Sequence, residues 1–246
     1  MIKVITIITK FIIVTLIALF FSSCIFSRDL KSITGSGHVT SENRMVQGSF
    51  KSIEVSNAID LEVEQSGKTE IIVEADDNLQ NEITTKVENG VLIIACKYSS
   101  LIDVESRKVI VKMPIINGLQ ASSASTIKSR NTLKGENIDL KASSAADVNL
   151  SLEFDAIYCK ASSGSSINID GKALKLETNS SSGSTIDAKD LLVNEVIAKA
   201  SSGGSINVHP IVNLDAKASS GGDINYNVTP KRIEKRTSSG GSVEQE

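Results

Sequence analysis

The segment ASSGSSINI (residues 161–169) is the most informative stretch of this sequence, because variants of it return through the C-terminal half, among them ASSGGSINV (200–208). Counted from the first serine of each Ser-Ser pair, the copies are separated by 21, 19, 19, 20, 18 and 19 residues. A period in this range indicates a repeat protein built from small supersecondary units. The first serines are Ser122, Ser143, Ser162, Ser181, Ser201, Ser219 and Ser238.

Apolar and polar residues alternate on both sides of each serine pair. Every copy has Ile or Val five positions after the first serine, followed by a polar residue and, in most copies, another apolar one. This period of two is typical of a strand with one buried face. The Ala or Gly two positions after the first serine indicates a tight corner. The predicted inward ladder is Ile127, Val148, Ile167, Ile186, Ile206, Ile224 and Val243.

A unit of about 19 residues with short strands cannot bury its own apolar side, so it has to stack on its neighbours. The sequence therefore predicts a β-solenoid, in which equivalent residues form ladders about 4.8 Å apart. An antiparallel sandwich or propeller-like sheet is the alternative, although such folds typically use longer units and more aromatic residues. Before residue 119 the pattern is less regular, but residues 53–63 match the repeat when Ser56 takes the place of the first serine.

The first 23 residues have the order of a signal peptide. Lys3 and Lys10 flank an opening that leads into the apolar run 11–21, and two serines then precede Cys24. The sequence FSSC (21–24) resembles the lipobox of bacterial lipoproteins, with Phe in place of the usual Leu, which implies lipidation at Cys24. An uncleaved transmembrane anchor is the alternative, because the apolar stretch 1–26 is almost long enough to span a bilayer.

Three blocks of sequence resemble a known family. FKSIEV (50–55) leads into AIDLEV (58–63), and EADDNL (74–79) and the serine repeats follow. In this order they are similar to the GIN-domain auto-transporter adhesin head family, which is common among lipoproteins of Bacteroidetes. The resemblance implies an all-β fold, a right-handed parallel β-helix-like solenoid, and it implies little about activity. The expected organisation is a signal peptide (1–23), a lipid-anchored tether (24–44) and a GIN-type solenoid (45–246).

The residues that could carry chemistry do not form a catalytic set, and we predict no enzyme activity, cofactor or metal. A serine nucleophile needs a base within reach, but the two histidines are His38, in the expected tether, and His209, beside a proline. Asp76 and Asp77, with Asn78 and Glu82 nearby, are the one candidate calcium site. A solvated acidic turn is the favoured interpretation of that segment.

Cys96 and Cys159 lie in apolar, strand-like runs. Two separately buried thiols are favoured over a disulfide between them, because a thiol in such a run packs as a small hydrophobic group.

A basic row two positions before the first serine is the candidate binding surface. A row of like charges could engage an acidic polysaccharide, lipid headgroups or another protein. Acidic residues two positions further upstream favour a solvated, mixed-charge face instead. After residue 23 the chain has 24 basic against 29 acidic residues, which argues against nucleic acid as a partner. The basic row comprises Lys141, Lys160, Lys199, Lys217 and Arg236, and the acidic residues are Asp139, Glu177, Asp215 and Glu234.

Two classes of function remain open. The first is a cell-envelope lipoprotein, at the outer membrane and facing the periplasm or the surface, with a non-enzymatic, adhesin-like binding domain for an envelope protein or polysaccharide. The second is a structural envelope component that self-associates. The final repeat bears on the second, because Lys235, Thr237 and Gln245 stand where other copies are apolar. We therefore expect a polar cap that prevents end-to-end polymerisation.

Overall fold

The computed structural model describes residues 32–98 and 100–246, so the predicted signal peptide and Cys24 lie outside the described residues. These residues form a 17-stranded sheet, a two-stranded sheet and one 3₁₀ turn, η1 (Asp77–Leu79). The strands are β1 (Ser32–Thr34), β2 (Val39–Asn43), β3 (Ser52–Ser56), β4 (Asp60–Gln65), β5 (Glu70–Asp76), β6 (Ile83–Glu88), β7 (Val91–Cys96), β8 (Ser100–Ile102), β9 (Arg107–Met113), β10 (Gly118–Ala121), β11 (Thr126–Ser129), β12 (Leu133–Ala142), β13 (Asp147–Ala161), β14 (Ser166–Ser181), β15 (Thr185–Ser201), β16 (Ser205–Ser219), β17 (Asp223–Tyr226), β18 (Arg232–Ser238) and β19 (Ser242–Gln245).

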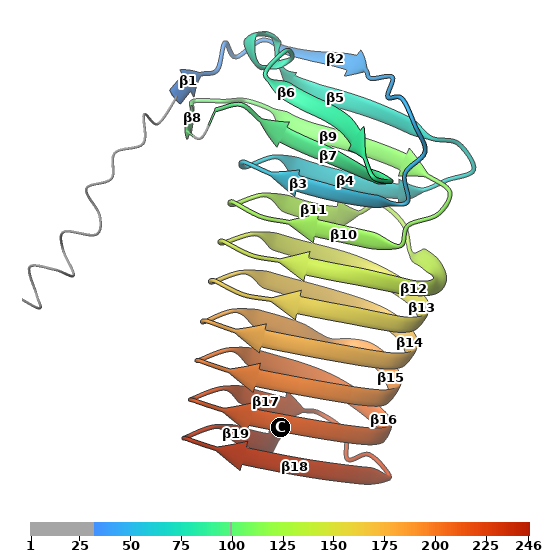
Figure 1. Cartoon of the computed structure of the whole chain (residues 1–246), viewed down its shortest axis with the longest axis vertical. Coiled ribbons are helices and arrows are strands. Elements are labelled where there is room, and N and C mark those ends of the chain that lie inside the picture. Colours follow the sequence, from blue (N-terminus) through green and yellow to red (C-terminus); the bar gives the residue numbers. More distant parts are fainter. Residues whose placement is uncertain (1–31, 99) are drawn as a thin grey trace, which may run out of the picture.

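From β10 onward the chain winds as a right-handed solenoid of about seven turns (Figure 1). Each strand pairs in parallel with the strand one coil later, and the register equals the sequence repeat. Ile127 pairs with Val148, Val148 with Ile167, and Ile167 with Ile186. This register confirms the predicted solenoid. A 19-residue unit stacks in this way because its backbone N–H and C=O groups find hydrogen-bond partners only in the coils above and below it.

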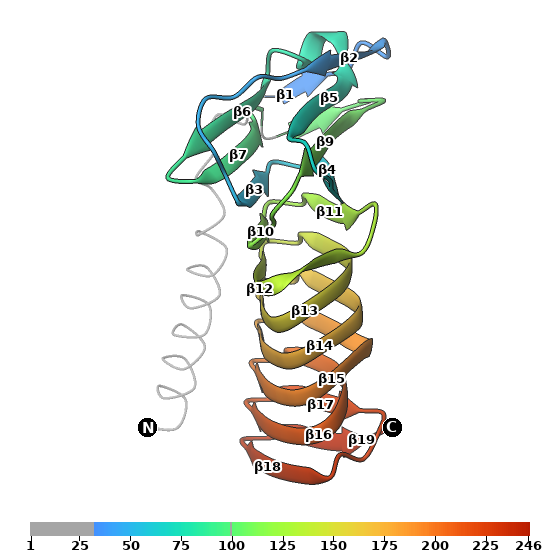
Figure 2. The same cartoon turned by 90° about the vertical axis from the view of Figure 1, so that its right-hand side faces the viewer.

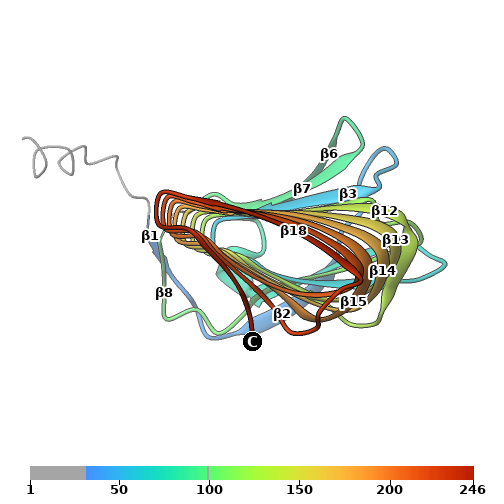
Figure 3. The same ribbon diagram turned by 90° about the horizontal axis from the view of Figure 1, so that it is seen from below.

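The serine pairs form the narrow edge of the solenoid, opposite a broad bend (Figure 3). In each corner the second serine and the next residue have positive φ, as at Ser163 (55°) and Gly164 (68°). Two consecutive left-handed residues reverse the chain as in a type I′ turn. The Gly164 N–H then donates to the Ser182 carbonyl in the next corner at 3.1 Å. The repeated serines are therefore the structural corner that the sequence predicts.

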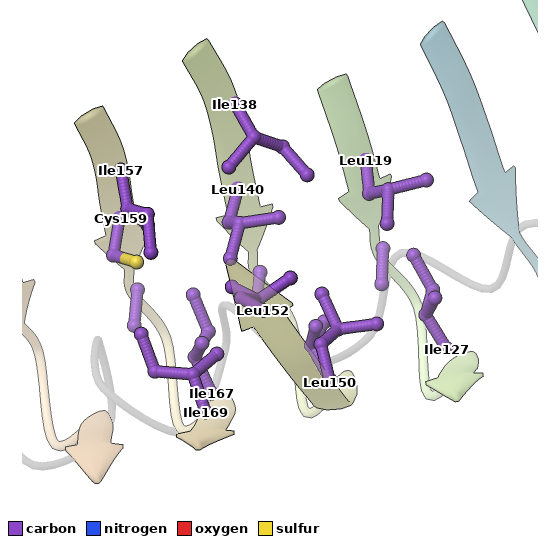
Figure 4. Close-up of a cluster of buried hydrophobic side chains, with 14 of the residues drawn as sticks. Leu119, Ile127, Ile138, Leu140, Leu150, Leu152, Ile157, Cys159, Ile167 and Ile169 are labelled. Carbon is purple, nitrogen blue, oxygen red and sulfur yellow. The ribbon is translucent and has the colours of Figure 1, made fainter. Parts of the chain in front are cut away.

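The interior is a narrow stack of aliphatic side chains between the two long faces. Ile167, Ile186 and Ile206 are fully buried, and each packs on the equivalent residue of the neighbouring coil. Figure 4 shows these ladders in the earlier coils, from Leu119 to Ile169, with Cys159 among the inward side chains. Cys96 and Cys159 are free, buried thiols, as predicted, and burial raises the pKa of both.

The first coils are stacked in an order that differs from the order of the chain. β3 pairs in parallel with β7 on one side and β10 on the other, and β4 lies in the same way between β9 and β11. The chain thus builds the second coil first, then the outermost one, and then returns to the third. The predicted match at Ser56 is confirmed, because Asn57 and Ala58 repeat the corner with φ of 62° and 59°.

Antiparallel strands cover the N-terminal end of the solenoid. β5 pairs with β9 and β2, and β6 forms a hairpin with β7 that projects from the stack (Figure 2). β1 and β2 lie within residues 24–44, so part of the expected tether belongs to the sheets. These pairings occupy backbone groups that an open first coil would expose.

At the opposite end, polar residues continue the apolar rows. Lys235 aligns with Ala216, and its Nζ lies 4.6 Å from the centre of the Tyr226 ring and donates to the Val243 carbonyl at 3.2 Å. Gln245 aligns with Tyr226 and accepts a hydrogen bond from Thr229 at 2.9 Å. The last coil thus places a cation and an amide across the end of the aliphatic core.

Candidate functional site

The basic row runs along one face of the solenoid, on β12, β13, β15, β16 and β18. Lys141 pairs in register with Lys160, Lys199 with Lys217, and Lys217 with Arg236. Asn179 of β14 lies between Lys160 and Lys199. All five basic residues are exposed, because the intervening positions of each strand point into the core.

Acidic neighbours neutralise only part of this row. Lys199 lies 3.7 Å from Glu177 of the preceding coil. Arg236 donates a hydrogen bond to Asp215, which raises the pKa of the guanidinium, and also pairs with Glu234. Among the residues that the structure describes, no acidic partner is within ion-pair distance of the other three cations. These are Lys141, Lys160 and Lys217.

The opposite face carries a polar ladder whose hydrogen-bonding groups are engaged with one another. The Asn168 side-chain amide donates to Asn149 at 3.0 Å, and Asn225 donates to Asn207 at 3.3 Å. Such contacts follow from the parallel register, which sets equivalent amides side by side. Amides of this face are therefore engaged with their equivalents in the neighbouring coils.

In the candidate calcium segment, the buried carboxylate of Asp76 joins backbone N–H groups from two other parts of the chain, and we call this arrangement the clip. Asp76 is fully buried and accepts hydrogen bonds from the N–H groups of Gly37 (2.9 Å), Ser106 (2.9 Å) and Glu105 (3.1 Å). Burial alone would raise the pKa of Asp76, but these donors together lower it. A Cβ at Gly35 would collide with the Asp76 carboxylate, so the entering chain passes very close to it. The interpretation of the whole segment as a solvated turn is wrong at Asp76, although Asp77 is exposed.

The two histidines are the candidate bases that the sequence offers. Within the ranges 32–98 and 100–246, no hydrogen bond joins the imidazole of His38 or His209 to a serine hydroxyl. The same ranges contain no cluster of three or more His, Cys, Asp or Glu side chains suited to a metal. They also contain no helix long and apolar enough to cross a membrane.

A pocket of about 730 Å³ near the N-terminal end is a feature that the sequence analysis missed. It lies between the β2–β3 loop, the start of β5 and the β9–β10 loop, and Met45, Phe50 and Ile115 contribute to its lining. Met45 is 99% exposed and Ile115 48% exposed. These loops lack the repeat, so no periodic signal in the sequence could reveal that they meet.

The described solenoid thus carries a basic row on one face, and its repeated serines form structural corners. Its fold alone does not define a function. The chain belongs to the family described as "Putative auto-transporter adhesin, head GIN domain", whose model matches residues 49–230. The family relationship expected from the sequence blocks is thereby confirmed. Comparison with curated proteins finds no match.

Solved structures share the fold at low sequence identity. A Bacteroides fragilis structure titled "putative adhesin" has a TM-score of 0.80 at 20% identity, covering 87% of this chain and 99% of its own. A Parabacteroides distasonis structure titled "Putative lipid binding protein" has a TM-score of 0.70 at 21% identity, covering 87% and 99%. A second P. distasonis structure, titled "putative adhesin", has a TM-score of 0.70 at 24% identity, covering 87% and 100%. These proteins carry adhesin or lipid-binding names and not enzyme names.

Proposed function

We propose that this protein is a cell-envelope lipoprotein, acylated at Cys24, whose solenoid binds an acidic surface polymer through the basic row. The family supports an adhesin-like binding role at the envelope. The observation that carries the proposal is the alignment of five exposed basic residues on one face, three of them without an ion pair among the described residues. Like charges in a row favour a ligand that is itself an extended anion.

The second candidate, a self-associating envelope component, is less well supported. Antiparallel strands cover one end of the solenoid, and at the other end the last coil places Lys235 and Gln245 over the core. End-to-end growth needs a free coil edge with apolar residues beneath it, and Lys235 places a charge there.

Binding of the described body to immobilised polygalacturonate tests the proposal. Changing Lys141, Lys160 and Lys217 to Gln should weaken binding about threefold to hundredfold, because each exposed ion pair contributes about 0.2–1 kcal/mol. Binding of the unchanged protein should also fall as salt is raised. The control variant changes Lys68, Lys86 and Lys97 to Gln. These are exposed lysines near the N-terminal end of the solenoid, so the control removes the same number of charges.

Equal loss in both triple variants would show a non-specific charge effect and would overturn the assignment of the row. Sedimentation of the unchanged protein tests the second candidate function, because a self-associating component must form larger species as its concentration rises.

A further inference from the structure

The pocket near the N-terminal end is built by three segments that are held together by backbone hydrogen bonds. The Arg44 N–H donates to the Ile71 carbonyl at 2.8 Å, and the Asn117 N–H donates to the Lys51 carbonyl at 2.7 Å. The β2–β3 loop is therefore fixed at both ends, and its middle part, with Met45 and Gly48, lies over the pocket. A cavity of about 300–1,000 Å³ is the usual size of a small-molecule site, and this pocket has about 730 Å³.

The lining is mainly apolar and gathers exposed hydrophobic groups. Met45 and Ile115 are two of the exposed large hydrophobic side chains of the described chain, and Phe50 and Pro114 lie beside them. A single exposed aliphatic residue is ordinary on a protein surface. Several around one concave pocket indicate a site for an apolar ligand.

The charges at the pocket favour an anionic group on that ligand. The guanidinium of Arg44 is held by Gln80 (2.6 and 2.9 Å) and paired with Glu42 (3.2 Å), so its charge is already balanced. Lys51 is exposed and lies outside every ion pair that the described residues form. The lining carboxylate, Glu70, is already paired with Lys112 at 2.8 Å.

A second apolar groove, of about 550 Å³ at the broad bend, provides a comparison within the same molecule. Its cations, Lys134 and Lys172, both contact Glu153 at 2.9 and 3.0 Å, and these contacts lower the pKa of that carboxyl. The groove includes Leu174, which is 56% exposed. It therefore offers apolar surface without a free positive charge.

We propose that the pocket formed by Arg44–Lys51, Thr69–Ile71 and Pro114–Ile115 binds a single-chain fatty acid, with the acyl chain along Met45, Phe50 and Ile115 and the carboxylate at Lys51. The concave shape suits one free molecule better than the flat surface of a bilayer. The site is separate from the basic row, so it does not depend on the function proposed for that row.

Calorimetric titration of residues 32–246 with laurate tests this site. That segment folds on its own, because solved relatives that consist almost entirely of this body share the fold. We expect one laurate per chain and no binding of dodecyltrimethylammonium, which has the same tail and the opposite charge. Decanoate should bind about threefold to fifteenfold more weakly than laurate, because each buried methylene contributes about 0.8 kcal/mol.

Variants distinguish the pocket from other surfaces. The double change Met45→Ser and Ile115→Ser should weaken laurate binding at least tenfold, whereas Leu174→Ser in the second groove should leave it unchanged. Lys51→Gln should weaken the binding of laurate and not that of dodecanol. Lys68→Gln, in the neighbouring β4–β5 loop, should change the binding of neither. Thermal unfolding verifies that each variant is folded, and Met45, at 99% exposure, has little role in stability.

Three results would overturn the proposal. The first is equal laurate binding by the unchanged protein and by the Met45 and Ile115 double variant. The second is equal affinity for laurate and dodecyltrimethylammonium. The third is binding to anionic phospholipid vesicles without binding to laurate, which would make the surface a membrane contact. The triple variant of the basic row should bind laurate normally. Polymer binding and laurate binding therefore test the basic row and the pocket separately.

Discussion

Deleting residues 233–246 tests whether the last coil caps the solenoid. The deletion removes β19 and nearly all of β18, and it uncovers Leu214 and Ile224, which are 2% and 0% exposed. A fully buried Leu or Ile contributes about 1.5–3 kcal/mol, and each would lose cover on one side only. We therefore expect a loss of about 1.5–3 kcal/mol of unfolding free energy, or about 3–12 °C in Tm.

The new end should also associate, because it exposes unpaired strand edges above an apolar core. Sedimentation velocity over a hundredfold range of concentration measures this directly. Lys235→Ala isolates the cap residue, and loss of its contact with the Tyr226 ring should cost about 0.5–2 kcal/mol. Lys217→Ala, an exposed lysine of the basic row, is the matched control and should change stability little. A truncated protein that stays monomeric and as stable as the full chain would refute the capping argument.

The remaining predictions concern the core, the clip and the anchor. Ile186→Asp should cost several kcal/mol in urea unfolding, because it buries a carboxylate between two coils, whereas the outward Asn207→Asp should cost about 0.2–1 kcal/mol, since Asp187 is its neighbour in register. Asp76→Asn should cost about 1–3 kcal/mol, because an amide cannot accept all three N–H groups, and hydrogen exchange should accelerate at those amides. Cys24→Ala should leave an unprocessed precursor without incorporated fatty acid in acyl labelling.

Each of these predictions has a clear contrary result. Equal destabilisation of the Ile186 and Asn207 variants would contradict the inward and outward assignment, and normal acyl labelling of the Cys24 variant would end the lipoprotein proposal. The pKa of Asp76 is lowered in the folded state, so its contribution is present above the ordinary value of about 3.9 and is lost as pH falls below it. If Asp76→Asn had the same unfolding free energy as the unchanged protein at neutral pH, and the same loss towards acid pH, the clip would contribute nothing.

The repeat determined much of the fold in advance, because every coil of a solenoid has nearly the same surroundings. The alternation around each serine pair identified Ile186 as inward, and the pair itself as a corner. The same reasoning extended to Ser56, which lies between the first two family blocks, and to the polar residues of the last coil. In these places the neighbours of a residue are copies of itself, so a local pattern already contains the tertiary contact.

The candidate sites were predictable only in part. Spacing placed the five basic residues in one row, but it could not show that Glu177 reaches Lys199 while Lys217 remains free, because such pairs depend on side-chain conformation. The acidic segment at Asp76 was misread for a related reason. Its partners, Gly37 and Ser106, are 39 and 30 residues away in sequence, and no local signal marks them.

By itself, therefore, the sequence determined the repeating body: its period, its inward and outward faces, its corners and its polar end. Only the tertiary structure decided how the irregular first part is arranged. There the chain forms the second coil before the outermost one, and the Asp76 carboxylate accepts a hydrogen bond from Gly37, just before β2. It also brings the loops at Met45 and Ile115 together around a pocket. The physical reason is that these contacts join segments with different sequences and no shared period, so their register exists only once the chain has closed on itself.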